Sequence, residues 1–159
     1  MTESADLLYH LPAARSDDQR RYMEELESAG ICVFCPEHFD AHHREPVELR
    51  GRHWYVTRND FPYAGTEAHF LIVPNRHVSS FDELPDDAAA DLWALKRELK
   101  ARLGDPPATA TVERSGDMRL NGGSVSHLHV HFVVLGESPE QTVRFRVSAK
   151  ADEEVAAWR

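Results

Sequence analysis

The sequence predicts an α+β fold with a mostly antiparallel sheet, one long helix, and shorter helices near the two ends. Two observations support this class. Short apolar or alternating segments of strand length recur along the chain, and they do not alternate regularly with helices. A single long helical repeat lies among them, where Leu92, Leu95, Leu99 and Leu103 follow the spacing of one helix face.

The chain has 159 residues, which is enough for one domain with a substantial core. We expect a single domain over 1–159. Within it, 1–30 is an N-terminal extension with a helix, 31–136 is the core, and 137–159 holds a C-terminal strand and helix.

The first predicted helix begins after Ser16, whose hydroxyl suits an N-cap. Tyr22, Met23 and Leu26 give that helix one apolar side, and Gly30 is a suitable stop. The long helix begins at Pro85, which is favoured in a first turn, and runs to about Leu103. A terminal helix is predicted over 152–159.

The strands are predicted from apolar runs and from alternation of apolar and polar residues. They cover 52–58, 69–73, 109–113, 125–135 and 142–147. The polar stretch 37–50 is predicted to be a loop with room for a helical turn, and 59–66 and 114–124 are also predicted to be loops.

The formal net charge of −9 argues against nucleic-acid binding driven by bulk electrostatics. It does not exclude a nucleotide, because a few donors in one cavity can bind phosphate. There is no apolar run of membrane-spanning length, and the polar N-terminal stretch lacks the pattern of a signal peptide. We therefore expect a cytoplasmic protein that binds neither nucleic acid nor membrane. There, Cys32 and Cys35 favour metal binding or redox chemistry over a structural disulfide.

Three histidines alternate along the predicted strand 125–135. Because alternate strand residues face the same way, His127, His129 and His131 line one face, roughly 6–7 Å apart. The apolar residues between them can pack against a core. Two alternative interpretations are three surface histidines on an edge strand, and a metal-dependent hydrolase with a three-histidine site.

The segment His-Leu-His-Val-His-Phe-Val-Val resembles the motif of the histidine-triad family, in which three histidines alternate with apolar residues. Three further blocks in the same order are similar to that family. They are the Cys-x-x-Cys pair, the strand that leads through Pro74 to His77, and the glycine loop before Ser124. The similarity covers roughly 31–136.

The resemblance implies that His129 is a nucleophile that attacks the α-phosphorus of a nucleotide. A neutral imidazole suits this role at neutral pH when its other nitrogen is fixed by an acceptor. By the same resemblance, His131 and Ser124 contact phosphate. Gly123 stands where the family has glutamine, and Asn121 is a candidate substitute for that donor. Asn59 resembles the family's ribose-binding residue, with Asp60 as its rival.

In branches that resemble galactose-phosphate uridylyltransferase, a structural zinc ion is held by two cysteines and two histidines. The corresponding residues are Cys32, Cys35, His77 and His127, which offer two thiolates and two imidazoles. Three nearby histidines are competing ligands: His38, His42 and His43.

The resemblance thus implies a nucleotide hydrolase or nucleotidyltransferase that forms a nucleotidyl-histidine on His129. An alternative is a dinucleoside-polyphosphate phosphorylase or nucleotidylyltransferase that uses phosphate or sugar phosphate as acceptor. Another is a nucleotide-binding protein without turnover. The family also implies a homodimer, which an exposed sheet edge permits.

Overall fold

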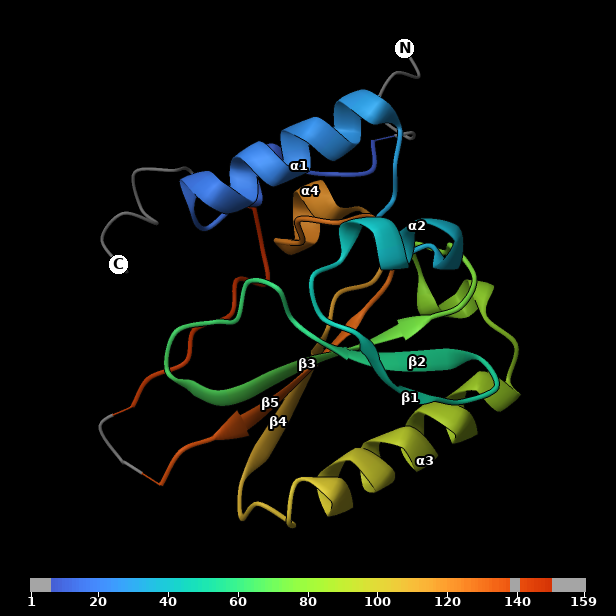
Figure 1. Ribbon diagram of the computed structural model, residues 1–159, viewed down its shortest axis with the longest axis vertical. Helices are drawn as coiled ribbons and strands as arrows, with labels where there is room; N and C mark the ends of the chain where they lie inside the picture. Colours follow the sequence, from blue (N-terminus) through green and yellow to red (C-terminus); the bar gives the residue numbers. More distant parts are fainter. Residues whose placement is uncertain (1–6, 138–140, 150–159) are drawn as a thin grey trace.

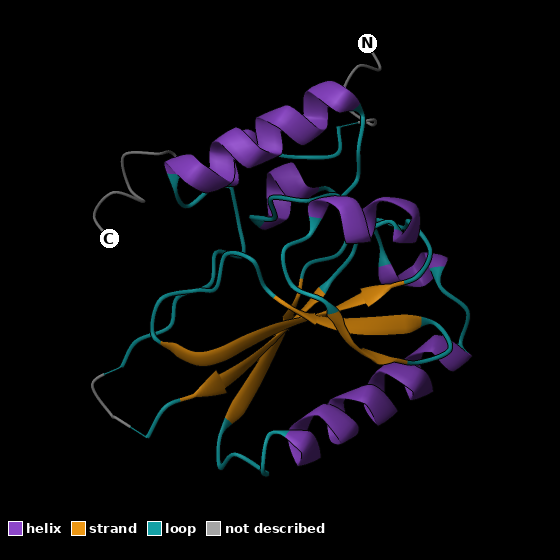
Figure 2. Cartoon of the chain, in the orientation of Figure 1, coloured by secondary structure: helices purple, strands orange, loops and turns teal. Residues whose placement is uncertain are grey.

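A five-stranded antiparallel sheet lies at the centre of the computed structural model, which describes residues 7–137 and 141–149 (Figures 1 and 2). Along the sheet the strands follow the order β1-β2-β3-β5-β4. Their bounds are β1 Val47–Arg50, β2 Trp54–Arg58, β3 Thr66–Pro74, β4 Thr109–Glu113 and β5 Val130–Leu135. The predicted α+β class with an antiparallel sheet is confirmed.

The long helix α3 (Asp87–Arg102) covers one face of this sheet, the lower face in Figure 1. Its Leu95 and Leu99 are buried against a core that includes Phe70, Ile72 and Phe132 from the central strands. The other two leucines of the predicted stripe pack at the margin of the same core. The sequence therefore placed both the helix and its buried side correctly.

The remaining α-helices lie on the opposite side of the sheet (Figure 1). They are α1 (Asp17–Ala29), α2 (Pro36–His42) and α4 (Met118–Asn121), and two short 3-10 helices are η1 (Leu11–Ala13) and η2 (Phe81–Glu83). The start and end of α1 match the prediction. Ser16 Oγ accepts a hydrogen bond from the Gln19 backbone N–H at 3.1 Å, and Gly30 ends the helix at a φ of 66°.

A second core lies between the sheet and these N-terminal elements. Strand alternation explains it, because Leu71 and Val73 of β3 point to the face opposite Phe70 and Ile72. Leu71 and Val73 join Met23 of α1 in this core. The N-terminal part of the chain is thereby packed onto the sheet face that carries the histidines.

Strand β5 is shorter than predicted, because it begins at Val130 and not at residue 125. The preceding residues pair elsewhere. The backbone N–H of Ser126 donates to the carbonyl of Leu8, and that of Leu128 donates to the carbonyl of Val78. His127 and His129 thus precede the ladder, yet the alternation persists, since Leu128 lies in the α3 core.

Other differences concern short elements. The predicted loop 37–50 holds most of α2 and all of β1, and the loop 114–124 contains α4. The predicted strand over 142–147 is wrong, because that segment has no regular secondary structure. The terminal helix predicted over 152–159 lies outside the described residues.

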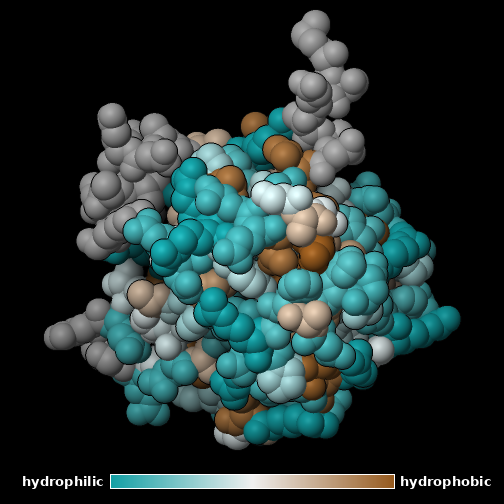
Figure 3. Space-filling model, turned by 45° about the horizontal axis from the view of Figure 1, so that its top comes forward, coloured by the Kyte–Doolittle hydropathy of each residue, from teal (hydrophilic) through white to brown (hydrophobic). Residues whose placement is uncertain are grey.

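The face that carries α1 is mostly hydrophilic, with apolar side chains gathered in small areas (Figure 3). In residues 7–137 and 141–149, none of the helices combines the length and the apolar character that a membrane span requires. Strands β1 and β4 lie at the two edges of the sheet. The homodimer suggested by the sequence stays a prediction.

Candidate active site

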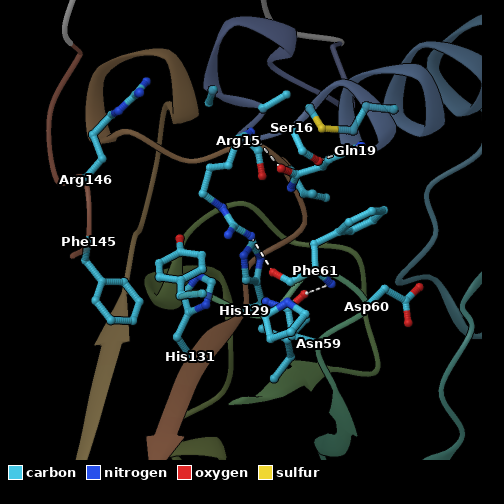
Figure 4. Close-up of a pocket in the computed structure, with 18 of the residues that line it drawn as sticks. Arg15, Ser16, Gln19, Asn59, Asp60, Phe61, His129, His131, Phe145 and Arg146 are labelled. Carbon is cyan, nitrogen blue, oxygen red and sulfur yellow. Dashed lines mark hydrogen bonds between the residues drawn. The ribbon is translucent and has the colours of Figure 1, made fainter. Parts of the chain in front are cut away.

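A cavity of about 790 Å³ lies between α1 and the histidine-bearing face of the sheet. Segments far apart in the sequence form its walls: η1 and α1, the loop 59–64, the end of β4, the triad, and the C-terminal segment 142–148. Its volume is within the range of small-molecule sites. Figure 4 shows Arg15, Asn59, His129 and Phe145 around this space.

His129 lines this cavity with one ring nitrogen already fixed. Its Nδ1 lies 2.8 Å from the carbonyl oxygen of His127, which can only accept, so Nδ1 carries the proton. Nε2 therefore keeps its lone pair. Burial, together with the nearby Arg114 guanidinium, lowers the pKa of His129 to about 4. At neutral pH the ring is uncharged, which suits a nucleophile.

His131 lies beside His129, with a distance of 4.9 Å between the two ring centroids. Its Nδ1 is 2.8 Å from His69 Nε2, and its Nε2 is 3.0 Å from a terminal nitrogen of Arg114. Burial lowers the pKa of His131 well below its usual value, with nearby positive groups adding to the effect. The residue predicted to contact phosphate thus lies next to a cation.

The glycine loop brings Ser124 to the cavity wall, and the carbonyl of Ser124 accepts from the backbone N–H of His10 at 2.9 Å. Asn121 is placed differently. Its Nδ2 donates to the carbonyl of Ser115 at 3.1 Å, and its Oδ1 accepts from the Gly123 N–H at 3.0 Å. Asn121 organises the loop, and the phosphate role predicted for it gains no support from this position.

The absence of glutamine at Gly123 has a local explanation. A Cβ added there would lie 3.0 Å from Asn121 Oδ1 and 3.3 Å from Met118 Cβ. A larger side chain would therefore require α4 or Asn121 to shift. The loop that contains α4 is built around a glycine at this position.

The two predicted ribose contacts lie in different surroundings. Both residues are on the cavity wall, where Asn59 Oδ1 accepts from the Phe61 N–H at 2.9 Å. The Asp60 carboxylate points away from His129 (Figure 4) and pairs with His43 Nδ1 at 3.2 Å. It also accepts from the Arg44 N–H at 3.0 Å. Of the two, the geometry favours Asn59 as a ligand contact, which stays a prediction.

The four predicted zinc ligands form one cluster in the fold. Cys32, Cys35, His77 and His127 each offer one ligand atom, and these atoms all lie within 4.8 Å of one another. His127 Nε2 donates to the carbonyl of Pro74 at 2.9 Å, so its Nδ1 is free to face the sulfur atoms. They form a possible metal site.

The chemistry of this set fits a zinc ion. Burial raises the pKa of Cys35 to about 12, because a thiolate loses its hydration there. A divalent cation reverses this preference, and two sulfur and two nitrogen atoms match tetrahedral zinc. The competing ligand His43 pairs with Asp60 instead. Among the described residues, His38 and His42 are outside the cluster.

Several cavity residues have no counterpart in the sequence predictions. Arg15, Arg44, Arg114, Arg144 and Arg146 line the cavity of a chain whose net charge is −9. The Arg15 guanidinium lies 3.9 Å from the ring centroid of Tyr63. In the sequence, nothing distinguishes these arginines from ordinary surface arginines. Only the fold brings them together, and their joint charge favours an anionic ligand.

Comparison with known proteins adds to this picture. The family profile described as HIT domain matches residues 49–138. The chain is 30% identical over 89 residues to a protein of Mycobacterium tuberculosis named AP-4-A phosphorylase, covering 55% of this chain and 45% of that protein. It is 28% identical over 79 residues to an adenosine 5'-monophosphoramidase of Candida albicans, covering 48% and 52%. The chain thus spans about half the length of these curated relatives.

A solved structure of a zinc-bound histidine triad family protein from Mycobacterium smegmatis has a similar fold. The TM-score is 0.55 at 18% identity, and the match covers 80% of this chain and 88% of that one. At this identity the likeness concerns the fold.

Proposed function

Because the chain belongs to the HIT domain family, we propose that it is a nucleotide hydrolase or nucleotidyltransferase with His129 as its nucleophile. The observation that carries this proposal is the fixed orientation of the His129 ring. Its Nδ1–H donates to the His127 carbonyl, and the ring lines a cavity that also holds five arginines. A nucleophile and cations for phosphate therefore meet in one space.

In the first step, the lone pair of His129 Nε2 attacks the α-phosphorus. A phosphorus–nitrogen bond forms, and the bond to the leaving group breaks with its electron pair on that group. The Nδ1 proton stays on the ring, where the His127 carbonyl stabilises the developing imidazolium charge. The arginines balance the charge of the phosphate oxygens.

In the second step, an acceptor attacks the same phosphorus, and the bond to His129 breaks with its electron pair on Nε2. Water as acceptor releases its proton to solvent and gives a nucleoside monophosphate. Inorganic phosphate as acceptor gives a nucleoside diphosphate. Ser124 and Asn59, which both line the cavity, are proposed to position the nucleotide.

The four-residue cluster would hold a structural zinc ion through Cys32, Cys35, His77 and His127. The ion would connect the N-terminal segment to His127, which lies two positions before His129. Its effect on His129 is indirect, through the His127 carbonyl that accepts the Nδ1 proton.

The alternative of a hydrolase with three histidine ligands does not fit the structure. His127 faces the cysteines, whereas His131 Nε2 lies 3.0 Å from the Arg114 guanidinium, a cation that would repel a metal ion. The alternative of a nucleotide-binding protein without turnover predicts binding and no products.

The test compares wild type with His129→Asn, and uses His38→Asn as a matched control outside the cavity. Each protein is incubated with diadenosine tetraphosphate or adenosine phosphoramidate, with and without inorganic phosphate. Mass spectrometry should detect a nucleotidyl adduct on wild type and on the control, and none on His129→Asn. Full turnover by a folded His129→Asn variant would refute the proposal, and products that change with phosphate would assign the acceptor.

A further inference from the structure

Arg114 is held at the end of β4 by contacts on three sides. Its Nε donates to the carbonyl of Arg146 at 2.7 Å, and one terminal nitrogen donates to the Tyr63 hydroxyl at 3.2 Å. The other terminal nitrogen lies 3.0 Å from His131 Nε2. A guanidinium keeps its charge and offers five donors in a fixed plane. Arg114 therefore presents a permanent cation beside the triad.

The series of hydrogen-bonding groups that runs from Tyr63 through His69 and His131 to Arg114 has more donors than acceptors. The Tyr63 backbone N–H donates to His69 Nδ1 at 3.0 Å, so His69 carries its proton on Nε2 and donates to His131 Nδ1. A neutral His131 then carries its own proton on Nε2, which faces the Arg114 donor. Two N–H groups meet at this point, and one oxygen of an anion can accept from both.

A second cation lies near the same place. The Arg15 guanidinium is above the Tyr63 ring, and that ring also packs on Phe145 at 4.5 Å between centroids. Tyr63 thus lies between two arginines, with its hydroxyl accepting from Arg114. Arg114 and Arg15 both line the cavity and both contact Tyr63, whose ring packs against that of His131 at 5.3 Å between centroids. Their charges therefore lie near the space next to His131.

The charge of this wall bears on the leaving group. An amine leaves phosphorus only when a proton is delivered to its nitrogen, whereas a phosphate leaves as an anion and needs a positive charge. Arg114 supplies charge and does not act as a proton donor in the acid–base sense. His131, the ring next to His129, is neutral in this arrangement, and the Nε2–H of a neutral imidazole donates a hydrogen bond without acting as a general acid.

We propose that Arg114 is a specificity-determining residue that selects substrates whose leaving group departs as a phosphate-bearing anion. This inference rests on the proposed function of His129. The bond from α-phosphorus to the bridging oxygen breaks, the electron pair stays on that oxygen, and Arg114 stabilises its charge without proton transfer. Nucleoside phosphoramidates, whose leaving group is an amine, gain no such help.

The experiment compares kcat/KM of the full chain for diadenosine tetraphosphate and adenosine phosphoramidate. Wild type should prefer the tetraphosphate. Arg114→Gln should lower kcat/KM for the tetraphosphate about 100-fold, which is the order of loss when one transition-state charge contact is removed. The same variant should change kcat/KM for the phosphoramidate by less than about threefold. Arg114→Lys should restore part of the preference. Arg119→Gln, which removes an arginine paired with Asp117 outside the cavity, is the matched control.

An equal loss on both substrates would overturn the inference, since Arg114 would then act on the shared α-phosphate or on the fold. A wild-type preference for the phosphoramidate would overturn it as well. The nucleotidyl adduct on His129 separates this failure from that of the proposed function. If wild type forms the adduct but Arg114→Gln leaves the ratio of kcat/KM for the two substrates unchanged, only the present inference fails. If wild type forms no adduct with either substrate, the proposed function itself fails.

Discussion

His69 Nε2 lies 2.8 Å from His131 Nδ1, which joins β3 to β5 on the cavity side of the sheet. Both histidines are buried, with 3% and 4% of their surfaces exposed. Burial, with smaller contributions from Arg15 and the neighbouring His129, lowers the pKa of His69 to about 3. Two neutral imidazoles thus lie next to each other near His129, and burial in the folded state keeps them neutral.

This pair predicts a loss of stability in mild acid. In the unfolded chain, histidine binds a proton below a pKa near 6.5, while folded His69 stays neutral until about pH 3. Between these values the unfolded state holds more protons, so the free energy of unfolding falls as pH falls. The slope is about 1.4 kcal/mol per pH unit for each such histidine. Urea denaturation of protein freed of metal with a chelator, carried out between pH 7.5 and 5, measures this slope.

His69→Gln provides the control for this slope, because it removes one of the titrating groups. The variant should be less stable at pH 7 and should lose stability less steeply toward pH 5. An unchanged slope would show that the acid sensitivity has another source.

Removal of the proposed zinc ion should destabilise the chain and leave the His129 side chain chemically intact. A ligand that binds only the folded state adds about 2.7 kcal/mol at a hundredfold excess over its Kd. Chelation or Cys35→Ser should lower the melting temperature, and elemental analysis should find one zinc ion per wild-type chain and less in the variant. His42→Asn, outside the ligand cluster, should keep the metal. Retention of zinc by Cys35→Ser would argue against this site.

Asp60 is predicted to stabilise the fold and not to contact ribose. Its side chain is 3% exposed and that of its partner His43 is 2% exposed, so removal of one partner leaves a buried polar group unpaired. Asp60→Ala should cost about 3 kcal/mol of unfolding free energy. Asp18→Ala, at a side chain 60% exposed, should change it by less than about 0.5 kcal/mol. A stable Asp60→Ala variant with a raised KM for nucleotide would assign Asp60 to the ligand instead.

Leu99 tests the core between α3 and the sheet. It is 1% exposed, and its truncation leaves a cavity among Phe70, Ile72 and Phe132. Leu99→Ala should lower the unfolding free energy by about 2–5 kcal/mol. Leu120→Ala, at a residue 70% exposed, should have an effect within about 0.5 kcal/mol. Similar effects at both positions in chemical denaturation would contradict this assignment of the core.

The features that were predictable from the sequence have local causes. Ser16 and Gly30 mark the ends of α1 through their own side chain or backbone, and the leucine spacing of α3 identifies its buried side. The alternation of the three histidines places Leu128 in one core and the triad on the other face. The possible metal site followed from resemblance, since no local rule pairs Cys32 with His127.

The features that were missed depend on contacts between distant segments. Strand β5 begins late because Ser126 pairs with Leu8, a residue more than a hundred positions earlier in the chain. Arg114 is the first residue of the predicted loop 114–124, and its contacts with Tyr63 and the Arg146 carbonyl exist only after folding. Short elements such as β1 carry too few residues for a periodic pattern.

The cavity extends beyond the part of the chain that the family shares. The family profile covers 49–138, which includes the triad and Arg114, whereas Arg15, Phe34 and Phe145 lie outside it. Under the proposed function, the residues that break the bond lie in the common middle, and the flanks add residues to the walls that a ligand meets. We therefore expect that an exchange of those flanks between relatives would change which molecules enter the cavity while His129 and Arg114 stay in place.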